Sequence, residues 1–526
     1  MWIVAPTALA IVGALAYSLY QGADLLLDSQ NRTGKTVDVN DTIKTTVTVL
    51  TLIGAVLTGI YAYRKQLLAE GDSHRADASQ LADRYSTAAE QMGHEQAAVR
   101  LAGVHAMARL ADDWPEQRQV CIDVLCAYLR MPYETDPSAT RFKAGEREVR
   151  LTIIRIIRDH LQDSEAPTTW CGRNLDFSGA TFDGGDFRHA RFTGGDVSFR
   201  GAQFTGGTVD FTQARFTGSA VDFAQAQFTG GRVDFGQARF VDGAVHFTET
   251  QLDGGKLSFS SAHFSGGTVN FIEAHFNGCK VNFGEAKFAD GQVNFSGAQF
   301  ADGTVWFDNA RFTGAFVSLG ETGFTGAAVT FYGARFTRGT VLFDRAHFAE
   351  GTVRFTAARF SGCTVSFTVA QFAGCAVSFA DVQFAVSSTL SFVRAHFTRG
   401  RISFDRSQLA EGTLSFDRSR FDGGAVSFDD AKFIGGRISF VRAWFTGGMV
   451  SFDSARFTGS TISFDSAQFA YGAVCFDSAQ FMGGEVSFRR TQRTGGTVTF
   501  DGVWFDRAVV SDWGPLPAIP VNSLPF

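Results

Sequence analysis

The amino-acid sequence predicts a mainly β fold in which residues 166–510 form a parallel β-helix, a solenoid of stacked coils. Phenylalanines recur at spacings that alternate between five and seven residues, as in the run from Phe199 to Phe216. The resulting 12-residue phrase occurs 26 times from Phe199 to Phe500, and Leu319 takes the place of Phe once. Self-similarity at a short, fixed period is typical of solenoids.

A second period predicts about 24 residues per coil. The residue before the second Phe of each phrase is cationic or histidine in every other phrase, and this series is Arg215, Arg239, His263, Lys287, Arg311, Arg335 and Arg359. In the phrases between, the same position holds mostly glutamine. A 12-residue coil would stack the two series on each other, whereas a 24-residue coil separates them and encloses four Phe rings. With strands about 4.8 Å apart, 14 coils make a rod of roughly 65 Å.

The positions two residues before each Phe alternate between Val and Ala, as in Val209 before Phe211 and Ala214 before Phe216. Near the start, in LDFSGATFDGGDFRHARF, the Phe residues are spaced by five. This pattern resembles the pentapeptide repeat family, with two extra residues in every second pentapeptide. The resemblance implies a right-handed quadrilateral parallel β-helix with one pentapeptide on each side and Phe or Leu along the axis.

Two uncharged apolar segments, at about 2–20 and 45–63, predict a transmembrane hairpin over residues 1–65 and hence the lipid bilayer as a partner. A cleaved signal peptide is the alternative for the first segment, and a buried helix of a soluble protein is the alternative for the second. Lys and Arg are slightly more frequent after the second segment than between the two, which favours a cytoplasmic β-helix in an integral membrane protein of the cell membrane. Seven cysteines without a CxxC motif or regular pairing agree with a reducing compartment.

Residues 66–165 are expected to form a small α-helical domain, because apolar residues recur at helical spacing. The run AVRLAGVHAMARLADDWPEQRQVCIDVLCAYLR resembles the HEAT-like segment of membrane-anchored bacterial pentapeptide repeat proteins. His105 in this run is interpreted as a packed core residue. The helix that ends near Gln162 is expected to cover the first coil, and residues 511–526 are expected to form a C-terminal cap or tail.

No catalytic, cofactor-binding or metal-binding residues are predicted. GxSxG, P-loop, HExxH and GxGxxG motifs are absent, and His263, His275, His347 and His396 share one outward position set by the repeat. Rows of Ser and Asp in the distal half are expected to bond to turn amides and hydroxyls of neighbouring coils. The sequence therefore points to a non-enzymatic protein.

The predicted function is a membrane-anchored rigid scaffold. The cationic series from Arg215 to Arg359 is the candidate surface for an anionic membrane or an unidentified acidic protein. In the opposing interpretation, Asp210, Asp222 and Asp234 neutralise the series, which then only keeps the rod soluble.

Two other functions remain open, a purely structural surface protein and a DNA mimic that binds topoisomerases, as some pentapeptide repeat proteins do. Residues 171–526 carry 30 Lys and Arg against 32 Asp and Glu, a net charge of −2, which disfavours DNA mimicry. Nucleic acid is also disfavoured as a partner, because no aromatic residues interleave the cationic series to stack bases.

Overall fold

The helical and solenoid parts of the chain are seen in a computed structural model, which describes residues 39–516 except 219 and 386, together with 13–14, 17–18, 20–22 and 25. The chain divides into two units, Met1–Ser86 and Thr87–Phe526. Most of the first predicted span, residues 2–20, lies outside the described residues, so the two-helix hairpin stays a prediction.

Helix α2 (Val39–Met92) is a single helix of 54 residues. Its segment Val47–Gln66, with a mean hydropathy of 1.5, is by length and composition apolar enough to cross a membrane. The helix has no break at the predicted boundary between residues 65 and 66. The local sequence RKQLLAE explains the continuity, because it consists of strong helix formers and contains no Gly or Pro.

The predicted helices before the repeats are α3 (Ala97–Asp113), η1 (Pro115–Gln117), α4 (Arg118–Arg130) and α5 (Glu146–His160). Val104, Met107 and Ala111 form the buried stripe of α3. His105 is exposed, so its interpretation as a core residue was wrong. It follows Val104 by one residue, about 100° around the helix, and therefore lies outside the buried stripe.

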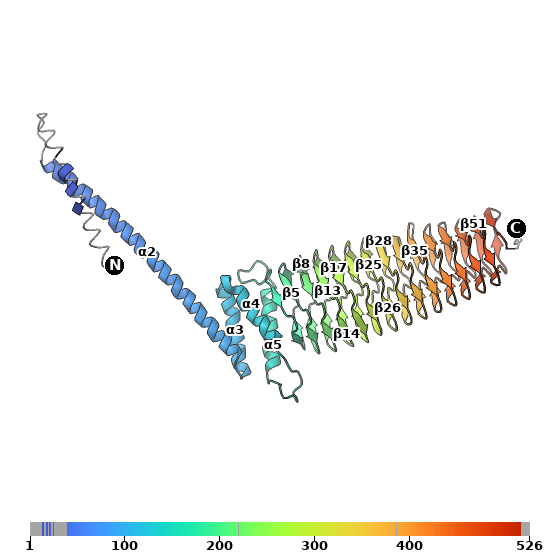
Figure 1. Ribbon diagram of the computed structural model, residues 1–526, viewed down its shortest axis with the longest axis horizontal. Helices are drawn as coiled ribbons and strands as arrows, with labels where there is room; N and C mark the ends of the chain where they lie inside the picture. The colour runs from blue at the N-terminus through green and yellow to red at the C-terminus, as the bar shows by residue number, and fades with distance from the viewer. Residues whose placement is uncertain are drawn as a thin grey trace. The chain divides into compact units, whose positions relative to one another are not determined.

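The solenoid is a stack of coils (Figure 1). Each coil has about 24 residues and four sides, as predicted. The strands of one coil are β7 (Thr208–Asp210), β8 (Arg215–Thr217), β9 (Ala220–Asp222) and β10 (Gln227–Phe228), and β11 (Arg232–Asp234) then begins the next coil. We call the sides that contain β7, β8, β9 and β10 sides one to four. Sides one and four are 14-stranded parallel sheets. Sides two and three merge into one 27-stranded sheet, because β28 (Arg335–Leu342) and β31 (Arg359–Ser366) run straight through the corner between them.

Phenylalanine fills the axis of every coil. Phe211 is fully buried and stacks on Phe235 of the next coil, with ring centroids 4.8 Å apart. This distance equals the usual separation of paired strands, so each ring column continues from coil to coil. Within one coil, Phe211 meets Phe223 edge to face at 6.4 Å, a favourable aromatic geometry.

The one-residue insertion between Phe384 and Phe392 is absorbed at a single corner. The partner of Arg359 is Gln383, 24 residues later, whereas the partner of Thr364 is Thr389, 25 residues later. The extra residue therefore lies between sides two and three, and the stacking continues on both sides of it.

Both ends of the solenoid are covered. Helix α5 packs on β3 (Gly185–Asp186) of the first coil, where the side chain of Ile154 lies close to Gly185. At the other end, Trp513 packs against Phe488, Phe500 and Phe505 with centroid distances of 5.3–5.9 Å. Residues 517–526 of the predicted cap lie outside the described residues.

Candidate interaction surface

The seven residues of the cationic series lie one above another on side two, and we call them the basic ladder. They occupy the first positions of successive paired strands, namely β8, β12 (Arg239–Val241), β16 (His263–Ser265), β20 (Lys287–Ala289), β24 (Arg311–Thr313), β28 and β31. In each pair the ladder residues are direct partners, as in Arg215 opposite Arg239. The backbone register thus places one of these side chains on every coil, as the 24-residue period predicts.

The ladder presents largely uncompensated positive charge. Its six Lys and Arg side chains are exposed, and no carboxylate of a described residue forms an ion pair with them. Burial lowers the pKa of His263 below its usual value of 6.5, and the charges of Lys287 and Arg239 lower it further. Lys287 and Arg239 are the direct strand partners of His263, so the charges of neighbouring ladder positions lie close together.

The first coils of the ladder line a surface groove of about 540 Å³. Its residues are Gln162, His189, Arg191, Gln213, Arg215, Gln237, Arg239, Ser261 and His263. One wall of the groove is the ladder. The other wall is formed by His189, Gln213, Gln237 and Ser261 in the turns between sides one and two, and Gln162 lies at the helical end. The groove offers hydrogen-bond donors beside the positive charges.

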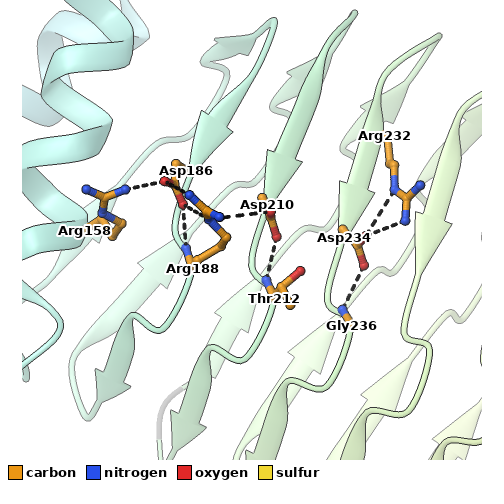
Figure 2. A network of polar contacts seen from close by, with 8 residues as sticks. All are labelled: Arg158, Asp186, Arg188, Asp210, Thr212, Arg232, Asp234 and Gly236. Atoms are coloured by element: carbon orange, nitrogen blue, oxygen red, sulfur yellow. Dashed lines mark hydrogen bonds and ion pairs between the residues drawn. The ribbon is translucent and has the colours of Figure 1, made fainter.

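The aspartates expected to neutralise the ladder do not reach it. Asp210 and Asp234 lie on side one, where Figure 2 shows them in line with Asp186. Asp210 accepts a hydrogen bond from the amide of Thr212 at 2.8 Å, and Asp234 accepts one from Gly236 at 2.9 Å. An aspartate two residues before an amide favours this local turn, which gives the carboxylate a backbone partner within its own coil.

These carboxylates also have cationic partners outside the ladder. Arg232 pairs with Asp234 on side one, and Arg200 lies 3.6 Å from Asp222 on side three. The interpretation in which Asp210, Asp222 and Asp234 neutralise the ladder therefore has no direct ion pair to support it among the described residues. Sequence proximity did not show which way each side chain turns.

The helical domain is joined to the solenoid through Asp186 of the first coil. Its carboxylate accepts hydrogen bonds from Arg188 at 2.9–3.0 Å and pairs with Arg158 of α5 (Figure 2). Burial alone would raise the pKa of Asp186, but the hydrogen bonds and charges of the two arginines lower it to about 2. The contact therefore stays ionised at neutral pH and supports the cap.

Arg191 extends the ladder by one coil and was missed in the sequence. It is the direct partner of Arg215 and begins the phrase RFTGG, a close match to RFTGS at Arg215. Its guanidinium donates a hydrogen bond to the Ser164 hydroxyl at 3.3 Å. Beyond Arg359 the column continues with Gln383 and Gln408, so the ladder ends there.

The distal Ser and Asp rows join successive coils, as predicted. Ser451 donates to Asp429 of the preceding coil at 2.5 Å, and Ser487 donates to Asp465 at the same distance. The amide of Arg489 also donates to Asp465 at 3.0 Å. These carboxylates have structural partners on the neighbouring coil.

Among the described residues, no group of three or more His, Cys, Asp or Glu is placed to hold a metal ion. Burial raises the pKa of the thiols of Cys126, Cys279 and Cys375 to about 12. These thiols are therefore protonated and poor nucleophiles at neutral pH.

The comparisons with known proteins agree with the fold. A family model described as pentapeptide repeats (9 copies) matches residues 171–209, and no curated protein matches the chain. The matched residues form the first coils of a solenoid whose later coils stack on them with the same four sides. Such a solenoid fits a structural or interaction role. The family match and the continuous solenoid together support a pentapeptide repeat protein.

Proposed function

We propose that this protein is a membrane-anchored, non-enzymatic scaffold whose basic ladder binds an anionic membrane surface. The observation that carries the proposal is the set of six exposed Lys and Arg side chains in the ladder, which have no ion-pair partners among the described residues. Pentapeptide repeat β-solenoids are generally non-enzymatic scaffolds, which agrees with this role. The apolar segment Val47–Gln66 supplies the proposed anchor.

The spacing of the ladder suits a charged plane. Side chains on successive coils start about 4.8 Å apart, which is less than the Debye length of about 8 Å at physiological salt. Their potentials therefore add, and each Lys or Arg held near an anionic leaflet contributes about 1 kcal/mol. An anchor in the same chain would raise the local concentration of lipid headgroups around the ladder.

A vesicle-binding experiment tests the ladder. We expect fragment 87–526, which contains the solenoid and its described caps, to co-sediment with phosphatidylserine vesicles but not with phosphatidylcholine vesicles. The ladder variant changes Arg215, Arg239, Arg311, Arg335 and Arg359 to Gln. It should bind at least about tenfold more weakly at low salt, because five favourable charges are lost.

The matched control changes five exposed arginines elsewhere on the solenoid to Gln, namely Arg338, Arg354, Arg399, Arg401 and Arg437. It should retain most of the binding. An equal loss in both variants would show that total charge, and not the ladder, determines binding. No binding to either vesicle type would contradict the membrane proposal and leave an acidic protein as the candidate partner.

The proposed cytoplasmic location of the solenoid rests on the basic residues Arg64, Lys65, Arg75 and Arg84 after the second predicted span. A reporter that is active only in the cytoplasm should work when it is fused after Phe526. The same reporter inserted after Lys35, between the two predicted spans, should be inactive. The reverse pattern of activity would refute the proposed topology.

A further inference from the structure

The corner between sides three and four carries a second column of side chains, one on each coil, which we call the corner column. From the helical end it consists of Gln225, Glu249, Glu273, Gly297, Glu321, Arg345, Val369, Arg394, Arg418, Arg442, Ser466 and Arg490. The amide of Glu249 donates to the carbonyl of Ile272, the residue before Glu273, and this bond repeats along the column. The column is therefore continuous.

The corner column changes sign at its middle. From Glu321 toward the helical end the residues are acidic, neutral, acidic and acidic. From Arg345 toward the other end they are basic, neutral, basic and basic. Over these eight positions, from Glu249 to Arg418, the two halves are mirror images of opposite charge.

The charged side chains of the column are exposed. Glu321 and Arg345 pair within the chain at 3.1 Å, but both side chains are more than 60% exposed, so this ion pair is weak. Glu273, Arg394 and Arg418 have no ion-pair partner among the residues that the structure describes. The column therefore has charge available on both halves.

We propose that two copies of this chain associate side by side and antiparallel along the corner column. A twofold axis between the coils of Glu321 and Arg345 would place Glu273 opposite Arg394 of a second copy. By the same symmetry, Glu249 would lie opposite Arg418. Because both rods have the same coil spacing, all these pairs fit one register. Such a self-complementary contact is the isologous interface of a closed dimer.

The flanking columns permit this arrangement. The first positions of the side-four strands, from Gln251 to Arg420, carry one formal charge, Arg420, which would face Gln251 of the second copy. In the turns between sides three and four, just before the corner column, Asp344 would face Gly320 of the second copy and Asp417 would face Thr248. Both aspartates already accept hydrogen bonds from the next coil. Asp344 accepts them from the Ser366 hydroxyl and the Thr368 amide, and Asp417 from the Ser439 hydroxyl and the Val441 amide. Asp253 would face Asp422 of the second copy, but Asp422 already accepts a hydrogen bond from Arg420 at 2.7 Å and pairs with His396 at 2.6 Å.

The charge pattern favours a second copy over other partners. A polyanion or an anionic membrane would attract the arginine half and repel the glutamate half. A parallel pair of chains would place Glu opposite Glu and Arg opposite Arg. Only the antiparallel pair satisfies both halves at once, and the contact adds to the proposed membrane role without depending on it.

A charge-exchange experiment tests the interface. The full chain in an uncharged detergent at low salt should sediment as a dimer, and it should dissociate at high salt. A variant with Arg394→Glu and Arg418→Glu should be monomeric, as should a variant with Glu249→Arg and Glu273→Arg. An equimolar mixture of the two variants should form a dimer, because the opposite charges then face each other in both halves.

These substitutions should not disturb the fold, because Glu249, Glu273, Arg394 and Arg418 have the same backbone conformation, with φ of 55–57°. The control variant carries Lys256→Glu and Lys280→Glu, two exposed neighbours on side one, and it should remain dimeric. A monomeric parent chain would overturn the proposal. So would variants that stay dimeric alone, or a mixture that stays monomeric.

A disulfide experiment tests the antiparallel direction. Full chains with Glu273→Cys should cross-link to chains with Arg394→Cys on oxidation, and neither variant should cross-link to itself. Cross-linking of Cys at position 273 with the same position of another copy would mean that the two chains are parallel, and the antiparallel proposal would be wrong. The unsubstituted chain measures any background from native cysteines.

Discussion

Replacing Phe295 by Asp should open the solenoid locally, at a cost of at least about 4 kcal/mol. Phe295 is fully buried, stacks on Phe271 at 4.8 Å and meets Phe307 edge to face at 6.2 Å. The substitution removes these contacts and places a carboxylate among aromatic rings. Each coil contacts mainly its neighbours, so limited proteolysis of the full chain should show new cleavage sites near residue 295.

Phe295→Leu is the matched control, because Leu319 occupies the same column one coil later and is 1% exposed. We expect its cleavage pattern to resemble that of the parent chain. An unchanged pattern for Phe295→Asp would contradict the inward position of this side chain. Cleavage throughout the solenoid would contradict independent local opening.

The second large effect is expected at Gly207, in the turn between sides four and one. A Cβ atom there would lie 2.1 Å from the carbonyl oxygen of Asp183 in the preceding coil, and φ is +61°. Gly207→Ala should therefore reduce local stability by about 3 kcal/mol through steric overlap and backbone strain. Hydrogen exchange of the full chain should show faster exchange in the first two coils.

The adjacent Gly206 is a sharp control. A Cβ atom at this position would meet nothing within 4 Å, and its φ is not in the positive range. Gly206→Ala should change local stability by no more than about 0.5–1 kcal/mol. Equal effects at the two positions would disprove close approach of the coils as the reason for glycine at Gly207.

The 24-residue coil could be predicted from the sequence because the same residue pattern recurs in many repeats. The alternation between the Arg215 series and the Gln series reveals the coil length from its period alone. The strands pair in the register that this period predicts. The paired glycines of the turns have two different structural reasons. Positive φ explains Gly207, but Gly231, without a positive φ, lies where a Cβ atom would be 3.0 Å from the backbone of the preceding coil.

The directions of side chains could not be predicted from the repeat. In one interpretation of the sequence Asp210 neutralised the ladder, but in the structure its carboxylate accepts a hydrogen bond from the amide of Thr212. The charge reversal in the corner column was also missed, although Glu273 and Arg394 are plain in the sequence. It becomes visible only when positions one coil apart are read together at the correct corner.

The stacking order of the coils has a mechanical consequence. The inter-strand hydrogen bonds join successive coils, and each coil follows its neighbour directly in the chain. A pulling force applied to the two ends of the solenoid would therefore load the terminal coil first. Each coil that peels away releases 24 residues, or about 80 Å of extended chain. Under tension, such a rod would lengthen in a series of small, equal steps and limit the force transmitted to whatever it holds.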